Sequence, residues 1–115
     1  MAPKPWTYYA VVVKIVDADT SDVEIDLGFY TKREERLRLA RIDAWEVRGE
    51  ERPKGLVAKD RVIELIPVGS QVIITTEKKG KYGRYIAEVI FKAGEEDANL
   101  SDLLVEEGHA EYADF

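Results

Sequence analysis

An arginine, an aspartate and a glutamate lie within one short stretch, residues 37–46, with the sequence LRLARIDAWE. Leucines and arginines alternate at its start, which predicts a strand that carries them on opposite faces. Arg38, Asp43 and Glu46 would then meet where this strand ends. Charges grouped in this way are costly unless a metal ion and a phosphate neutralise them. The stretch therefore predicts the catalytic centre of a metal-dependent phosphodiesterase.

Two further clusters contain residue types that suit the same chemistry. They are Asp17-Ala18-Asp19-Thr20, between two predicted strands, and Lys81-Tyr82-Gly83-Arg84, at the start of a later strand. A phosphodiester resists attack because its own negative charge repels nucleophiles. A hard cation with oxygen ligands, two guanidiniums and a carboxylate base would together lower that barrier.

Alternating apolar residues predict five strands, and two stretches with a helical apolar stripe predict two helices. The strands are expected at residues 8–16, 22–27, 32–42, 71–76 and 85–91, and the helices at 55–66 and from Asn99 to Gly108. The first strand is apolar on nearly both faces, which predicts a central, fully buried position. Polar or turn residues predict loops at 47–54, 78–83 and 94–98.

The 115 residues are expected to form a single domain, residues 1–115. Three strands, a helix, two strands and a second helix predict an α+β, mainly β fold, a five-stranded OB-fold β-barrel with two helices. The sequence contains no cysteine, which excludes disulfides and thiolate metal sites.

The formal net charge of −6 is unusual for a protein that binds nucleic acid, but the charge is unevenly distributed. Residues 95–115 contain eight acidic residues and no Lys or Arg, so the rest of the chain carries +2. A polyanionic substrate would therefore be held by a few arginines and a cation rather than by a broad basic surface.

The apolar runs are too short to cross a bilayer, and residues 1–9 lack the apolar segment of a signal peptide. We therefore expect no membrane partner and a monomer that is cytoplasmic, or secreted if a signal peptide has been removed.

The three clusters resemble the motifs of the staphylococcal nuclease (thermonuclease) family in their order and spacing. The matching elements are Asp17-Ala18-Asp19-Thr20, Arg38-Leu39-x-x-Ile42-Asp43-x-x-Glu46 and Tyr82-Gly83-Arg84, and the similarity runs from about Val13 to Tyr112. One short motif would be a weak signal, but three in order, each at the end of a predicted strand, are fairly specific. The resemblance implies a Ca²⁺-dependent endonuclease that cuts DNA and RNA and leaves 3′-phosphate ends.

Residue by residue, the resemblance implies a Ca²⁺ ion bound by the carboxylates of Asp19 and Asp43 and by the backbone carbonyl of Ala44. Asp17 would lie nearby without binding the ion directly. Glu46 would be the general base that orients and deprotonates the attacking water.

The resemblance also implies the residues that contact the substrate. Arg38 and Arg84 would hold the scissile phosphate, and Lys81 and Tyr82 would line the nucleotide site. Apart from the resemblance, Tyr112 is a further candidate substrate-binding residue that would flank a base.

The sequence departs from the family pattern at several positions. Ala18 replaces a glycine, and Ala44 replaces a threonine whose carbonyl alone would bind the metal. Trp45 replaces the proline before the general base, which could alter how rigidly Glu46 is held. The sequence also stops at Phe115, where the family continues into a long helix, and the loop after Glu46 is shorter. The last two differences bear on stability and on the rim of the substrate cleft.

Several candidate residues also have a purely structural interpretation. Asp17 and Asp19 could be turn residues, and Arg38 could be a surface arginine paired with Glu35 or Glu24. Tyr82-Gly83-Arg84 could be a hairpin turn, and Lys78, Lys79 and Lys81 could be solvated lysines. Trp6 and Trp45 could serve packing, and His109 could be a surface residue without a role. Glu50 and Glu51 could form a solvated loop, although either could replace Glu46 as the base.

Two other functions stay open. The first is a catalytically inactive nuclease-like domain that binds nucleic acid or a protein partner; such relatives typically lose a metal aspartate, the base or an arginine, and all are present here. The second is a structural or interaction module, which the acidic residues 95–115 favour.

Overall fold

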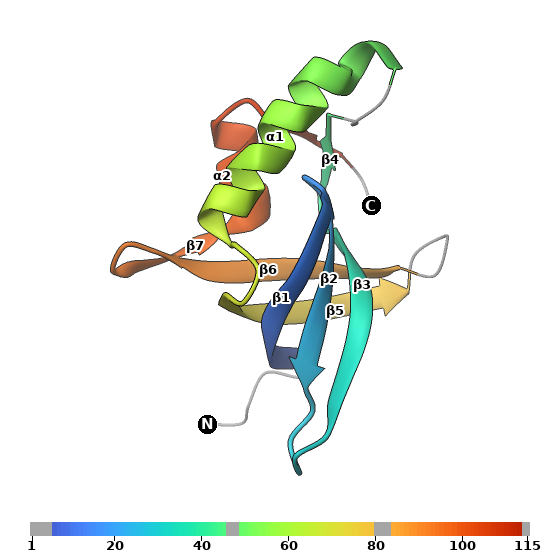
Figure 1. Cartoon of the computed structure of the whole chain (residues 1–115), viewed down its shortest axis with the longest axis vertical. Coiled ribbons are helices and arrows are strands. Elements are labelled where there is room, and N and C mark those ends of the chain that lie inside the picture. The colour runs from blue at the N-terminus through green and yellow to red at the C-terminus, as the bar shows by residue number, and fades with distance from the viewer. Residues whose placement is uncertain (1–5, 46–48, 80–83, 114–115) are drawn as a thin grey trace.

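The computed structural model describes residues 6–45, 49–79 and 84–113, and Figure 1 shows how their helices and strands are arranged. The elements are β1 (Thr7–Asp17), β2 (Thr20–Asp26), β3 (Lys32–Leu39), β4 (Ile42–Ala44), the 3-10 helix η1 (Gly49–Glu51), α1 (Arg52–Leu65), β5 (Gln71–Lys79), β6 (Tyr85–Ala93), β7 (Glu96–Asn99), α2 (Leu100–Glu106) and β8 (Ala110–Tyr112).

Five of the strands close into a barrel. They pair in the order β3-β2-β1-β5-β6, and parallel pairing of residues 37–39 in β3 with residues 85–87 in β6 joins the two ends. Within the described part of the chain, β7 pairs with β6 alone and extends it outside the closed barrel. Closure leaves few exposed sheet edges. The OB-type barrel with two helices that the sequence predicts is confirmed.

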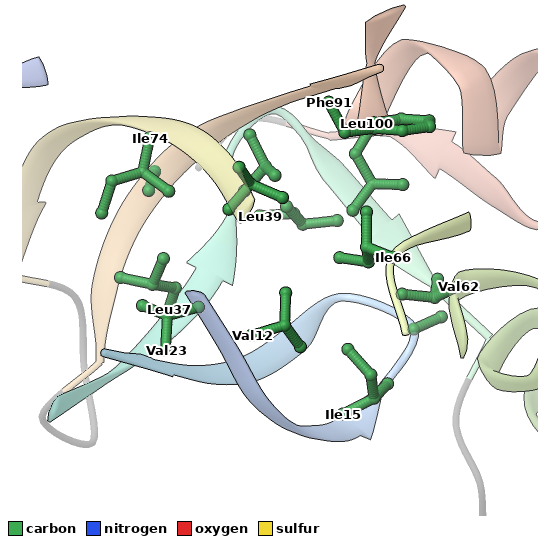
Figure 2. Packing of buried hydrophobic residues seen from close by; sticks show 14 of the residues in the cluster. Val12, Ile15, Val23, Leu37, Leu39, Val62, Ile66, Ile74, Phe91 and Leu100 are labelled. Atoms are coloured by element: carbon green, nitrogen blue, oxygen red, sulfur yellow. The ribbon is translucent and has the colours of Figure 1, made fainter. Parts of the chain in front are cut away.

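The hydrophobic core fills the barrel and continues under the helices at one end (Figure 2). Val23, Leu37 and Ile74 are buried inside the barrel, while Val62 of α1 and Leu100 of α2 are buried where the helices cover it. Each such side chain contributes roughly 1.5–3 kcal/mol when it is fully removed from water. This packing fixes the barrel end at which the candidate site lies.

β1 lies in the middle of the sheet, as predicted, but the prediction that both of its faces are buried is wrong. Val12 and Ile15 point into the core, whereas Tyr9, Val11 and Val13 are between 38% and 58% exposed. In a small barrel each strand has one inner and one outer face, and these exposed residues alternate with the buried Ala10 and Val12 along β1.

The third predicted strand, residues 32–42, is divided in two. β3 ends at Leu39, and the chain turns at Arg41, whose φ of 67° lies in the left-handed region. β4 then runs in a new direction and pairs with β8, a short strand that the sequence did not predict. The turn brings Asp43 back toward the end of β3, so this deviation is what shapes the site.

Three predicted loops are partly wrong. α1 begins at Arg52, inside the expected loop 47–54, because Pro53 fits the first helical turn, where an N–H has no intrahelical partner. β5 continues to Lys79, and much of the expected loop 94–98 is strand β7.

The helix α2 has the predicted N-cap, Asn99, and ends at Glu106, just before the predicted stop at Gly108. The Asn99 side chain accepts a hydrogen bond from the Asp102 backbone N–H at 3.2 Å, and Gly108, with φ of 80°, follows the helix end. Across the described ranges, no helix has both the length and the apolar character that crossing a bilayer requires.

Candidate active site

The turn between β1 and β2 brings the first candidate carboxylate to the end of β3. Asp17 pairs with Thr20 across a two-residue turn, in which Ala18 is buried. Thr20 pairs in turn with Arg38 on β3. Asp19 therefore lies beside Arg38 although the two are far apart in the sequence.

Arg38 is a buried residue, with only 7% of its surface exposed. Its Nη1 donates hydrogen bonds to the backbone carbonyls of Leu39 and Ile42, each at 3.0 Å. Its Nη2 lies 3.4 Å from Asp43 Oδ1 and 3.5 Å from Asp19 Oδ2. The interpretation of Arg38 as a surface arginine paired with Glu35 or Glu24 is wrong, because the β3–β4 turn folds over the guanidinium and supplies its partners.

Asp19 connects the β1–β2 turn to β4. Its Oδ2 accepts a hydrogen bond from the Ala44 backbone N–H at 3.2 Å, and its Oδ1 accepts one from the Thr20 hydroxyl at 3.0 Å. The N–H and C=O of one residue in an antiparallel strand point to the same side. We therefore expect the Ala44 carbonyl, a candidate metal ligand, on the side of β4 that faces Asp19.

Asp43 lies on the solvent side of the same cluster. Its side chain is 63% exposed, and the residue opposite it on β8 is Glu111, which is also exposed. Like charges directly opposite each other on paired strands repel. The contact between Asp43 and Arg38 offsets part of this repulsion, and a bound cation would offset more of it.

The second candidate guanidinium reaches the cluster from β6. The parallel pairing sets Tyr85 opposite Leu37, so Arg84, the preceding residue, enters beside the end of the barrel that carries Thr20. Arg84 Nη1 lies 3.3 Å from the Thr20 hydroxyl, which also bonds Asp19. Both arginines therefore contact the Asp19-Thr20 segment from neighbouring strands.

Other candidate residues lie elsewhere or outside the described residues. Asp17 pairs with Thr20 at the end of β1, and its charge adds to the effect of the Asp22 hydrogen bond, which is the main cause that raises the pKa of Arg36. Tyr112 is not brought into the cluster, because its hydroxyl donates to Asp102 on α2 at 2.9 Å. The predictions for Glu46, Lys81 and Tyr82 fall outside the described residues.

A charged network that sequence reasoning missed supports the turn behind the site. Arg41 bonds both carboxylate oxygens of Glu88 on β6, at 2.6 and 3.1 Å, and Asp102 on α2 at 3.0 Å. Its guanidinium also lies 6.0 Å from the centre of the Tyr112 ring. These contacts tie the β3–β4 turn to the barrel and to α2. Arg41 has a left-handed backbone conformation in the structure, but no local sequence pattern predicts it.

The network shifts the pKa values of its members. Hydrogen bonds with Glu88 and then Asp102 raise the pKa of Arg41, and the hydrogen bond from Arg41 lowers the pKa of Asp102. The hydrogen bond to Asp102 raises the pKa of Tyr112. All three groups therefore keep their neutral-pH protonation states, and the network stays intact at neutral pH.

The oxygen atoms of the cluster suit a hard cation. Ca²⁺ accepts carboxylates, backbone carbonyls and water with flexible geometry. In residues 6–45, 49–79 and 84–113, no group of three or more His, Cys, Asp or Glu side chains could hold a metal. The described residues would therefore offer two carboxylates, Asp19 and Asp43, with the Ala44 carbonyl. This donor set fits an ion that water and a substrate phosphate also help to hold.

A family of known proteins matches the larger part of the chain. The model of the staphylococcal nuclease homologue family matches residues 36–115, which include Arg38, Asp43 and Arg84. The chain belongs to the staphylococcal nuclease family. A search of curated proteins found no significant match.

Membership of the staphylococcal nuclease family indicates a nuclease-type function, and the closed barrel agrees with the family's OB-fold. The matched region begins at Arg36, after Asp17 and Asp19. Asp19 lies outside the matched region, but its carboxylate contacts Arg38 and Ala44 inside that region.

Proposed function

We propose that the protein is a monomeric, Ca²⁺-dependent endonuclease that hydrolyses the phosphodiester bonds of DNA and RNA and leaves 3′-phosphate ends. The observation that carries the proposal is the contact of Asp19 and Asp43 with one nitrogen of Arg38, next to the Thr20 hydroxyl that Arg84 contacts. Two carboxylates, from the β1–β2 turn and β4, and two guanidiniums, from β3 and the residue before β6, lie in one cluster, which supports a metal and phosphate site.

Arg38 and Arg84 would bind the substrate phosphate from two different strands. Arg38 is held by two backbone carbonyls through Nη1, and its Nη2 is directed toward Asp19 and Asp43. Arg84 would approach the same phosphate from β6. Guanidiniums donate to phosphate oxygens in pairs and favour the added negative charge of the transition state. Holding these groups in advance avoids reorganising them during the reaction.

The Ca²⁺ ion, held by Asp19, Asp43 and the Ala44 carbonyl, would supply neutralisation of the phosphate charge. The resemblance to the family supports Glu46 as the base that takes a proton from water, a role worth roughly 10²–10⁴-fold. Glu46→Ser should accordingly lower turnover far more than binding. Asp17 would add negative charge nearby.

The family resemblance also supports Lys81 and Tyr82 as residues of the nucleotide site. Tyr112 would act through the Arg41 network, since its hydroxyl bonds Asp102.

A cleavage assay tests the proposal. Plasmid and single-stranded DNA are incubated with the protein and either Ca²⁺ or a chelator. We expect cleavage only with Ca²⁺. A polymerase should extend the products only after a 3′-phosphatase has removed the phosphate from their 3′ ends. Equal cleavage in the chelator, or no cleavage with Ca²⁺, would contradict the proposal.

One observation favours a second function, a catalytically inactive domain that binds nucleic acid or a protein. Arg38 already contacts both Asp19 and Asp43, so the carboxylates are partly neutralised without an ion. In that case the protein would bind single-stranded DNA equally well in Ca²⁺ and in chelator and would leave it intact.

A further inference from the structure

A cleft of about 410 Å³ opens beside the end of β4. Its lining residues come from the end of β4, the first half of α1 and the turn that joins α2 to β8. The residues that line it are Trp45, Pro53, Lys54, Val57, Glu107, Gly108 and His109. Its volume falls within the range of roughly 300–1,000 Å³ that small-molecule sites occupy.

The cleft is next to the candidate active site because of the strand period. Asp43 and Trp45 are two residues apart along β4 and its end, so their side chains leave the backbone on the same face. The Trp45 N–H donates to the His109 carbonyl at 3.4 Å, which continues the pairing of β4 with β8. A strand rises about 3.3 Å per residue, so the two side chains start only about 7 Å apart.

The walls of the cleft combine an aromatic ring, apolar side chains and a cation. The Trp45 indole is fixed by a hydrogen bond from its Nε1 to the Gly108 carbonyl at 3.1 Å. Lys54 Nζ lies 4.8 Å from the centre of this ring. Val57 is 59% exposed, although it is apolar, because it borders this opening.

We propose that this cleft binds a nucleobase of the substrate strand, next to the phosphate held at the active site. The base would stack on Trp45 against Val57, and Lys54 would contact the phosphate attached to that nucleotide. The proposal rests on the proposed function, since the strand is the nuclease substrate. Stacking on aromatic rings tolerates any base, so this site would add affinity without strong sequence preference.

Three features select a nucleobase as the occupant. The cleft has a volume in the range of small-molecule sites, it has a fixed indole with a cation beside it, and its Trp45 is two residues from Asp43. Glu107 is held at the cleft by Arg61 at 2.7 and 2.9 Å, so its charge is already compensated. A phosphate near Lys54 would therefore meet little repulsion from this carboxylate.

Tryptophan fluorescence tests the proposal. Trp6 and Trp45 are the two tryptophans of the chain, so Trp6→Phe leaves Trp45 as the only indole. This protein is titrated in chelator with a single-stranded tetranucleotide and with an abasic chain of equal length and charge. We expect saturable quenching by the tetranucleotide, and binding at least about fivefold weaker for the abasic chain.

Trp45→Leu tests the role of the ring, and Trp45→Phe is its matched control. Binding is measured by the fluorescence anisotropy of a labelled tetranucleotide. Trp45→Leu should weaken binding by about 5- to 100-fold, whereas Trp45→Phe, which also loses the bond to Gly108 but keeps a ring, should retain most of it. Equal affinity for the two probes, unchanged binding by Trp45→Leu, or no binding at all would overturn the proposal.

The two proposals fail in different ways. Base-dependent quenching without Ca²⁺-dependent cleavage would remove the enzymatic function and keep the subsite. Cleavage with a KM unchanged by Trp45→Leu, and no quenching, would keep the enzyme and remove the subsite.

Discussion

Arg38 contributes to both the stability and the proposed chemistry of the site. Its guanidinium is buried, and four oxygen atoms from two backbone carbonyls and two carboxylates surround it. A buried cation is tolerated only when its hydrogen bonds are satisfied. The same contacts that satisfy Arg38 therefore gather Asp19 and Asp43 into one place.

Removing Arg38 should destabilise the fold. Arg38→Ala leaves the carbonyls of Leu39 and Ile42 and the Asp19 carboxylate without this donor, which should lower the free energy of unfolding by about 3–5 kcal/mol. Urea unfolding monitored by circular dichroism measures the change. Arg36→Ala removes an exposed arginine from the same strand and should cost much less. Equal losses for the two variants would contradict the assignment of Arg38 as the buried centre of the cluster.

Removing Arg84 should affect activity more than stability. Arg84 is half-buried, and its Nη1 donates to the neutral Thr20 hydroxyl at 3.3 Å. Arg84→Ala should lower kcat by roughly 10²–10³-fold, by analogy with the loss of one donor to a charged transition state. Initial rates on single-stranded DNA measure this, with Arg36→Ala as the control. Turnover within a few-fold of the parent would contradict the role of Arg84 as a phosphate clamp.

At the scale of single elements, two turns adopt left-handed conformations without glycine at the strained position. One is the β3–β4 turn at Arg41, where long-range ion pairs compensate for the strain. The other is the β2–β3 turn, where Phe29 and Tyr30 have φ of 55° and 58° and are fully exposed. Such strain costs about 1–2 kcal/mol per residue, so its compensation can be tested.

The β2–β3 turn should be easy to stabilise. The Thr31 N–H donates to the Gly28 carbonyl at 2.8 Å, which with two positive φ angles is typical of a type I′ turn. This turn favours Asn-Gly. The double change Phe29→Asn with Tyr30→Gly should raise the free energy of unfolding by about 1–2 kcal/mol in urea. An unchanged or lower value would mean that the two rings stabilise the fold through contacts of their own.

The β3–β4 turn should lose stability in acid. The hydrogen bond from Arg41 lowers the pKa of Asp102 below its ordinary value of 3.8. The stability from this pair is therefore present above pH 3.8 and is lost as the pH falls through the lower folded-state pKa. Urea unfolding between pH 7 and pH 2.5 should show a smaller decrease for Arg41→Gln than for the parent. Lys92→Gln, which removes an exposed pair with Asp97, should leave the decrease nearly unchanged. If the free energy of unfolding decreased equally with falling pH for all three proteins, the stabilising contact between Arg41 and Asp102 would be contradicted.

At the scale of the whole molecule, strand patterns and motif order predicted the barrel, its two helices and the convergence of Asp19, Arg38, Asp43 and Arg84. They could do so because apolar alternation specifies which face of a strand is buried. The three-residue strands β4 and β8 could not be predicted, since so short a segment has no readable period. The Arg41 network could not be predicted either, because its members meet only after the barrel, α2 and β8 have packed together.

The direct test of the account is the Ca²⁺ dependence of DNA cleavage in the parent, Asp19→Asn and Asp43→Asn, with Asp22→Asn as the control. Asp22, on β2, is also a carboxylate bonded to an arginine, but its partner is Arg36 on the barrel wall. We expect saturation at millimolar Ca²⁺ for the parent and the control, and a midpoint raised at least about tenfold by either site variant. Identical Ca²⁺ curves for all four proteins, or cleavage that persists in chelator, would contradict the assignment of this cluster as the metal and phosphate site.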